Sequence, residues 1–306
     1  MKSISAVVLA LFLFVSLTNA QLEPVNATCN FIYADGVYSC FLDELVLTSV
    51  NQPVTITGEH FPGYNNSMVG RVVIAPRSSI PFIMTQIFTE FGNLNTLWWV
   101  DGGLVAIQQN AFENARNLRN LYIIDNLLLT EIPANAFSGA VNLVELTMRH
   151  NRIVRVHPQA FYGVSNLIAI RLDMNHIHHL APNVFVQLPN LREVNLNDNA
   201  VEDLDGRIFA SNPQMAFAFF VRNEIGAIGR SLLDNIGSLR VLNLNGNICV
   251  SHDFSIVTPE DLEAMRPILR QCFENFGDES DVRRFTLEVR GSLVLFDEDG
   301  NEIVSL

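Results

Sequence analysis

The sequence predicts an α/β solenoid, a coil whose short strands form one parallel sheet on its inner face between two disulfide-braced end caps. Three observations lead to this fold class. An apolar pattern recurs about every 24 residues, each copy contains apolar residues spaced two apart, and four cysteines lie in two pairs outside the repeated region. A period this short indicates stacked units, each of which buries its apolar side only against its neighbours.

The repeat reads Leu-x-x-Leu-x-Leu-x-x-Asn, followed by aliphatic residues and a Phe. Three copies are nearly complete: Leu143, Leu146, Met148, Asn151, Ile153, Val156, Phe161; Leu167, Ile170, Leu172, Asn175, Ile177, Leu180, Phe185; and Leu191, Val194, Leu196, Asn199, Val201, Leu204, Phe209. Weaker copies begin at positions 69, 94, 118 and 215, and a partial one begins at Leu239 and breaks off at Cys249. We therefore expect seven full units and one partial unit.

Each repeat position has a predicted role. Apolar residues two apart face the same side of a strand, so they point inward and the residues between them point outward. The Asn lies where the chain leaves the strand, and its side chain can bond backbone groups that would otherwise be buried unpaired. The later aliphatics and the Phe fill the interior. The copy at 118 has one extra residue after Asn126, and we assign Leu128 to its core.

These residues resemble the extracellular leucine-rich repeat proteins of animals, which carry the typical 24-residue repeat. The resemblance covers residues 69–248. It implies a leucine-rich-repeat horseshoe, which is a right-handed solenoid with a concave parallel sheet, together with an extracellular location and protein or glycan ligands. It supplies no catalytic residues. The C-terminal cap has two cysteines and thus departs from the usual four-cysteine cap of the family.

We expect four segments along the chain: a signal peptide at 1–20, an N-terminal cap at 21–68, the repeats at 69–248, and a C-terminal cap at 249–306. The first segment has a basic start at Lys2, an apolar run from Ala6 to Leu17, and small residues up to Ala20. That apolar run is short for a membrane span. The interpretation is a secreted, extracellular protein without membrane insertion.

The cysteines are expected to pair locally, Cys29 with Cys40 and Cys249 with Cys272. The two pairs flank a stack roughly 35 Å long at strand spacing, whereas a disulfide requires Cα atoms within about 7 Å. Each disulfide then braces an end cap that shields the apolar interior.

Further features flank the repeats. Asn26 and Asn65 begin glycosylation acceptor triplets. Val54 to Thr57 is the best strand run in the N-terminal cap. Thr258 and Pro259 predict a helix start, with Pro267 expected to kink that helix. Short strands are expected in three segments of the tail, with a hairpin turn between the last two: 284–290, 292–296, 302–304, and the turn at Asp299-Gly300.

Candidate binding residues lie on the concave face. Aromatic side chains are predicted to project from it at Trp98, Tyr122, Phe217 and Phe219, and exposed aromatics are typical binding anchors. The alternative is that a cap or the tail covers them. Between the two aromatic patches we expect a charged centre made of Glu145, Arg149, Arg171, Asp173 and Glu193. Arg149 and Arg171 are candidate ligand contacts, and cross-strand ion pairing is the alternative that explains the centre adequately.

Other chemistries find little support. The formal net charge of −13 argues against nucleic acid, anionic membranes and heparin-like polymers, although a local basic patch would escape this argument. The histidines at 150, 157, 176, 178 and 179 have no cysteine or spaced carboxylate to complete a metal site, and a pH-sensing role is open to them. Asp297, Asp299 and Glu302 fit a hairpin turn better than a calcium loop. No cofactor motif or catalytic signature is present.

The resulting hypothesis is a secreted, non-enzymatic binding protein that recognises a protein or glycoprotein ligand through the concave face. Innate immune recognition is the favoured setting. The alternative is an extracellular structural or assembly protein that self-associates through its C-terminal hairpin, because an open strand edge can pair with another chain.

Overall fold

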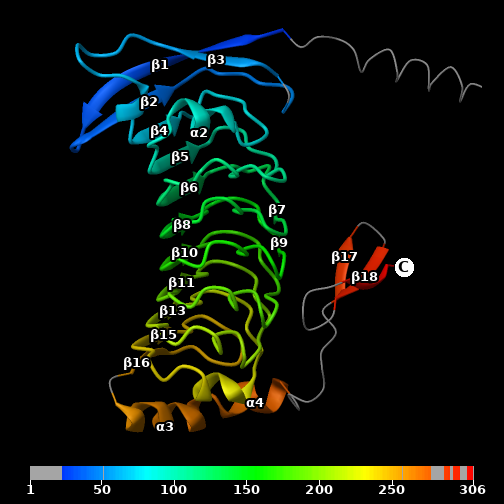
Figure 1. Ribbon diagram of the computed structural model, residues 1–306. Coiled ribbons are helices and arrows are strands. Elements are labelled where there is room, and N and C mark those ends of the chain that lie inside the picture. Colours follow the sequence, from blue (N-terminus) through cyan, green and yellow to red (C-terminus); the bar gives the residue numbers. More distant parts are fainter. Residues whose placement is uncertain are drawn as a thin grey trace, which may run out of the picture.

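The computed structural model describes residues 23–50, 52–256 and 258–276, together with three strands of the tail. Its coils stack into a solenoid with a parallel sheet along one side (Figure 1). The repeat strands in stacking order are β4 (Arg71–Ile74), β5 (Thr96–Val100), β6 (Asn120–Ile124), β8 (Glu145–Thr147), β10 (Ala169–Arg171), β11 (Glu193–Asn195), β13 (Phe217–Phe219) and β15 (Val241–Asn243). Their pairing is in register from copy to copy, as Ala169 opposite Glu193 and Glu193 opposite Phe217 show.

The repeat pattern explains the core. Inward residues of the strands, such as Leu146, Ile170 and Val194, are completely buried. On the return path the phenylalanines of successive copies form a stack with ring centroids 5.6–6.0 Å apart: Phe88, Phe112, Phe137, Phe161, Phe185 and Phe209. Each unit therefore buries its apolar side against the units above and below, as the period predicts.

The repeat asparagines bond the backbone as expected. Asn175 donates through Nδ2 to the carbonyl oxygens of Met148 (2.8 Å) and Leu172 (3.0 Å), and its Oδ1 accepts the N–H of Ile153 (3.0 Å). The same pattern of donation and acceptance recurs at Asn199, Asn223 and Asn247. One side chain in each copy thus joins adjacent turns of the coil.

The assignment of Leu128 to the core is wrong. Leu128 is 60% exposed, and Leu129 is the buried residue. In the later copies the residue two places after an asparagine donates its N–H to the next asparagine, but here the N–H of Asn126 itself bonds Oδ1 of Asn151. The extra residue is therefore accommodated as an outward bulge at Leu127 and Leu128.

The copy at 94 has Gly102 where the later copies have Asn. A Cβ atom on Gly102 would lie 2.6 Å from Nε1 of Trp99. Trp99 is completely buried at a position that Ile, Leu, Met or Phe fills elsewhere. The wide indole therefore requires a residue without a side chain at the turn.

The N-terminal cap extends the same sheet. Strands β1 (Val25–Ala34) and β2 (Val37–Leu42) are antiparallel, β3 (Val54–Thr57) pairs with β1, and β2 pairs in parallel with β4. The expected disulfide joins Cys29 to Cys40 at a Cα separation of 5.3 Å. A short 3-10 helix, η1 (Asn66–Met68), precedes β4 in the chain, and helix α2 (Gln86–Glu90) follows β4.

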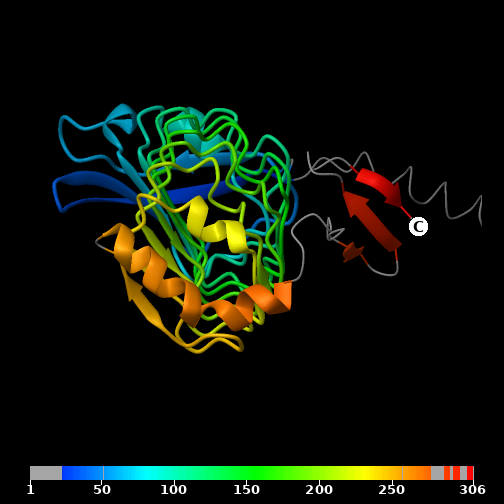
Figure 2. The same ribbon diagram turned by 90° about the horizontal axis from the view of Figure 1, so that it is seen from below.

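The C-terminal cap begins with a strand that the sequence did not reveal, β16 (Asp253–Ser255), which is antiparallel to β15. Helix α3 (Pro259–Ile268) starts with a capping box between Thr258 and Asp261. It ends at its C-cap Leu269, two residues after Pro267, and α4 (Arg270–Phe276) follows directly. The expected helix start and kink are confirmed. Both helices lie across the end of the coil (Figure 2).

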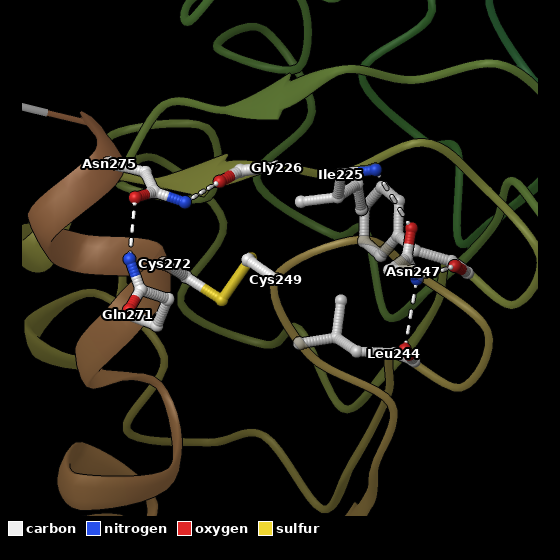
Figure 3. Close-up of a disulfide and its surroundings, with 9 residues drawn as sticks. Ile225, Gly226, Leu244, Asn247, Cys249, Gln271, Cys272 and Asn275 are labelled. Carbon is white, nitrogen blue, oxygen red and sulfur yellow. Dashed lines mark hydrogen bonds between the residues drawn. A yellow bond between two sulfur atoms is a disulfide. The ribbon is translucent and has the colours of Figure 1, made fainter.

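The second expected disulfide attaches α4 to the last repeat. Cys249 and Cys272 have a Cα separation of 5.2 Å, and Nδ2 of Asn275 donates to the carbonyl oxygen of Gly226 at 2.7 Å (Figure 3). Helix α4 packs beside β14 (Ala227–Ile228). The cap thus closes the apolar interior at this end, since Met265, Leu269 and Phe273 are buried.

The remaining elements are small. On the side opposite the main sheet, β7 (Glu131–Ile132) pairs with β9 (Arg155–Val156), β12 (Asp203–Leu204) pairs with β14, and η2 (Arg230–Asp234) follows. In the tail, β17 (Thr286–Val289), β18 (Ser292–Phe296) and β19 (Glu302–Ser305) form an antiparallel sheet near the expected positions. The predicted signal peptide and the Asp299-Gly300 turn lie outside the described residues. No helix within the described part is long and apolar enough to cross a membrane.

Candidate ligand-binding face

Two rows of outward residues run along the concave sheet, because every second residue of a strand faces away from the core. The first row contains Arg71, Thr96, Asn120, Glu145, Ala169, Glu193, Phe217 and Val241; the second contains Val73, Trp98, Tyr122, Thr147, Arg171, Asn195, Phe219 and Asn243. Most are partly exposed, but Ala169 and Thr147 are buried between larger neighbours.

Trp98 and Tyr122 form a stacked pair on adjacent strands, with ring centroids 4.4 Å apart. Both rings are half-buried, and Nε1 of Trp98 is buried without a hydrogen-bond partner. The Tyr122 hydroxyl donates to Glu145 at 3.2 Å. Burial, followed by the Glu145 charge, raises the pKa of Tyr122. Stacking fixes both rings before any ligand arrives, which lowers the entropic cost of using them as anchors.

The charged centre forms the ion pairs that were the alternative to ligand contact. Arg171 bonds Glu145 on one neighbouring strand and Glu193 on the other, the latter at 2.9 Å. Burial opposes the charge of Arg171, but the hydrogen bonds and charges of the two carboxylates outweigh burial and raise its pKa. Arg149 is held less tightly than Arg171, because its side chain is half-exposed and its Nε lies 3.8 Å from the carboxylate of Asp173.

The second aromatic patch lies on β13. Phe217 is 37% exposed and Phe219 is half-buried. Phe217 lies opposite Glu193, and Phe219 lies opposite Asn195. The described residues of the C-terminal cap therefore leave the Phe217 ring open to solvent.

These contacts form one band across the face. Trp98 stacks on Tyr122, Tyr122 bonds Glu145, Arg171 joins Glu145 to Glu193, and Phe217 is the next residue in the row. Five strand spacings separate β5 from β13, which is about 24 Å. We call these residues of the two rows together the concave band: Trp98, Tyr122, Glu145, Arg171, Glu193, Phe217 and Phe219.

The sequence analysis missed a second set of asparagines, at the edge where the chain enters the strands. Each donates Nδ2 to a carbonyl oxygen of the preceding copy at 2.8–3.1 Å: Asn93, Asn117, Asn142, Asn166 and Asn190. An Asn-Leu dipeptide at the start of most copies was the available signal. We call this edge the entry rim.

The histidines pair with carboxylates of neighbouring copies. His178 lies 3.5 Å from Glu202, and His179 lies 3.3 Å from Asp203, whose hydrogen bond raises the pKa of His179. His157 behaves oppositely, since burial lowers its pKa. Within the described ranges no group of three or more metal-binding side chains is gathered together.

Both candidate glycosylation residues are exposed. Asn26 lies in β1, and Asn65 caps η1, with its Oδ1 accepting the N–H of Ser67. Their occupancy remains a prediction.

Comparison with known proteins agrees with this architecture. A family model described as leucine rich repeat matches residues 92–153 and 142–201. A crystal structure of a TLR13–ssRNA13 complex is similar in fold, with a TM-score of 0.53 and 21% identity over 58% of this chain. This chain covers only 25% of that one. No curated protein matches. Residues 92–201 thus match the leucine-rich-repeat family, and the chain has the horseshoe fold of that class.

The comparison also bears on the exclusion of nucleic acid. The TLR13 structure pairs a protein of the same fold with single-stranded RNA. The net charge of this chain is therefore an insufficient reason to exclude nucleic acid, and that expectation finds no support here.

Proposed function

We propose that the protein is a secreted, non-enzymatic binding protein that recognises a protein or glycoprotein through the concave band. The supporting observation is the continuous band itself, with aromatic anchors at both ends and a charged centre between them. Interfaces draw most of their affinity from a few aromatic and arginine side chains surrounded by weaker polar contacts. The band has this composition.

The two ends of the band have different roles. Trp98 and Tyr122 present a preordered aromatic surface, whereas Phe217 presents an exposed ring whose burial would release water. The Glu145–Arg171–Glu193 group selects the ligand rather than adding affinity, because its charges are already paired with each other. Arg149, beside this group, has a side chain that is 51% exposed against 32% for Arg171, so it is the better placed of the two to meet a ligand carboxylate.

The extracellular setting rests on two supports. Disulfides persist in oxidising compartments, and the chain has one in each cap. The residues at 1–20 have the composition of a secretory signal. Innate immune recognition is the setting that we propose within that class; the likeness to the TLR13 structure concerns the fold and supplies no ligand.

The test is recovery of partners from extracellular fluid of the source with purified, glycosylated, full-length protein, by crosslinking and mass spectrometry. The test variant is Phe217→Glu/Phe219→Glu. The matched control is Leu127→Glu/Leu128→Glu, which adds the same charge at two leucines that are 46% and 60% exposed outside the concave band.

A protein or glycoprotein partner that is lost with the Phe217/Phe219 variant and retained with the control supports the proposal. A partner retained by both variants contradicts it for this patch. Recovery of nucleic acid alone would assign a different ligand class.

The tail supports a second candidate function, assembly of copies of the chain. Among the described strands, β17 and β19 are the outer strands of the sheet β17–β18–β19, and each pairs on one side only. Such edges can pair with another chain. A chain that ends after Phe276 should then be monomeric in light scattering while the full chain is larger. Equal masses per particle would contradict assembly through the tail.

A further inference from the structure

The arginines divide into two groups. Many pair with a carboxylate, as Arg155 does with Glu131. In the part of the chain that the structure describes, no carboxylate lies within ion-pair distance of four arginines near the entry rim: Arg116, Arg119, Arg192 and Arg240. Three of these directly precede a strand of the concave sheet, namely β6, β11 and β15. Arg152 and Arg230, which also have no carboxylate within ion-pair distance among the described residues, lie elsewhere, so four of these six arginines gather near one edge.

Acidic residues are missing from the same edge. Four successive rim segments, 138–144, 162–168, 186–192 and 210–216, contain neither Asp nor Glu. Glu145 and Glu193 directly follow two of these segments, and both are held by Arg171 on the concave face. Glu113, three residues before Arg116, and Asp234, six before Arg240, lie outside these segments. The four segments therefore place no carboxylate beside Arg192, although the whole molecule is acidic.

A cavity of about 330 Å³ opens on this rim between Arg119 and Arg192. Val144 and Ile168 lie between the two arginines and supply apolar surface. Ile168 is 38% exposed, although most large aliphatic residues of the chain are buried. The cavity thus combines two cations with an apolar middle.

The amides that line the cavity present acceptors. Nδ2 of Asn142, Asn166 and Asn190 donates inward to backbone carbonyls, so the remaining polar atom of each side chain is an oxygen. Gln214 differs, because its Oε1 accepts two hydrogen bonds from Arg192, at 3.1 and 2.8 Å, and holds that guanidinium in place. A ligand therefore meets oxygen acceptors in the middle and guanidinium donors at the ends.

We propose that this cavity binds an acidic oligosaccharide. Carboxylate or sulfate groups would pair with Arg119 and Arg192, hydroxyl groups would donate to the amide oxygens, and the apolar faces of the sugar rings would cover Val144 and Ile168. This site is separate from the concave band and does not depend on the function proposed for that band.

Two other polyanions fit less well. The amide oxygens repeat at the strand spacing of about 4.8 Å, whereas an extended peptide presents same-side groups about 6.6 Å apart, so its register with the rim is lost within a few residues. Proteins that bind single-stranded nucleic acid commonly stack its bases on aromatic rings, and none of the described residues that line the cavity is aromatic.

The test measures binding of fluorescent oligosaccharides to full-length protein by polarisation. The acidic probes are a hyaluronan hexasaccharide and a heparin hexasaccharide, which distinguish carboxylate from sulfate. Maltohexaose is the neutral probe, and oligothymidylate and an oligoglutamate peptide are the competing polyanions. The test variant is Arg119→Gln/Arg192→Gln. The control, Arg152→Gln/Arg230→Gln, removes the same charge from two exposed arginines that do not line the cavity.

We expect at least one acidic hexasaccharide to bind, maltohexaose not to bind, and the test variant to weaken binding by about tenfold or more, as the loss of charge-assisted hydrogen bonds implies. The control should keep the affinity of the unmodified protein. Absence of acidic oligosaccharide binding, an equal loss in both variants, or tighter rim-dependent binding of the nucleotide or peptide would overturn the proposal.

Discussion

Asn175 shows how much one residue contributes to this fold. Its side chain bonds three carbonyl oxygens and one N–H, and it is 3% exposed. These backbone groups have left the strand ladder, and most of them are shielded from solvent. Removing the amide leaves these groups unpaired in the interior. The free-energy cost of an unpaired buried group exceeds the net stabilisation that its hydrogen bond contributes to folding.

We therefore expect Asn175→Ala to lower the free energy of unfolding by at least about 2 kcal/mol. Asn166→Ala is the matched control, because Asn166 also donates to a backbone carbonyl but is exposed, so water replaces it. Urea midpoints and slopes measure both. Equal losses would show that the buried ladder has no special role.

At Gly102, introducing the asparagine of the repeat pattern should lower stability, because Trp99 lies against this residue. Gly102→Asn should destabilise the protein by roughly 1–3 kcal/mol, since its Cβ would overlap the Trp99 ring. The same change in a Trp99→Leu background should be better tolerated, because the indole is gone. A double-mutant cycle from thermal unfolding measures this coupling, and additive effects would refute it.

His179 predicts a small pH dependence. Its hydrogen bond to Asp203 raises the folded-state pKa above the ordinary value of 6.5, with Glu202 adding to the effect. The stabilisation is therefore complete below about pH 6 and is lost as the pH rises through the folded-state pKa.

The stability gap between the unmodified protein and His179→Gln should thus be larger at pH 5 than at pH 8. Because the His179 side chain is half-exposed, the gap should stay below about 1 kcal/mol. The lowered pKa of His157 acts in the opposite direction, but it is common to both proteins and cancels. A gap that grows toward pH 8 would reverse the assignment.

At the scale of elements, helix α4 depends on the Cys249–Cys272 disulfide, which closes a loop with a sequence separation of 23. Its contacts with the repeats also include the packing beside β14 and the hydrogen bond from Asn275 to Gly226. Cys249→Ser/Cys272→Ser should lower stability by about 3 kcal/mol.

Hydrogen exchange should locate this loss. Amides of α4 should lose protection in the double serine variant, whereas those of β6 and β8 should keep it, since each repeat contacts only its neighbours. Uniform loss of protection along the coil would indicate a single cooperative unit.

At the scale of the whole molecule, the length of the concave band determines which ligands can use it. Its aromatic ends are about 24 Å apart, so only a macromolecule can contact both. Once a ligand is known, Tyr122→Ala and Phe217→Ala should each weaken binding by about 1–3 kcal/mol, and the double variant should show the sum, since distant sites are additive. Calorimetric titration measures this, and a single variant without effect would confine the interface to the other end.

Much of this molecule could be predicted from local pattern. The repeat period located the stacked strands, the buried phenylalanines and the asparagine turns, and separation along the stack was enough to pair the cysteines. Thr258 and Pro267 located the start and the kink of the terminal helix pair. These features depend on strand and helix periodicity and on short-range hydrogen bonding, which a single copy of the repeat already contains.

Other features required the tertiary structure because they depend on what lies beside each copy. Leu129 rather than Leu128 enters the core, since the next asparagine selects the register of the insertion. Arg171 takes both neighbouring glutamates, whereas Arg119 and Arg192 are left without a carboxylate. Residues 24 apart along the chain become neighbours about 4.8 Å apart, and only this lateral stacking decides which charges are paired and which remain available to a ligand.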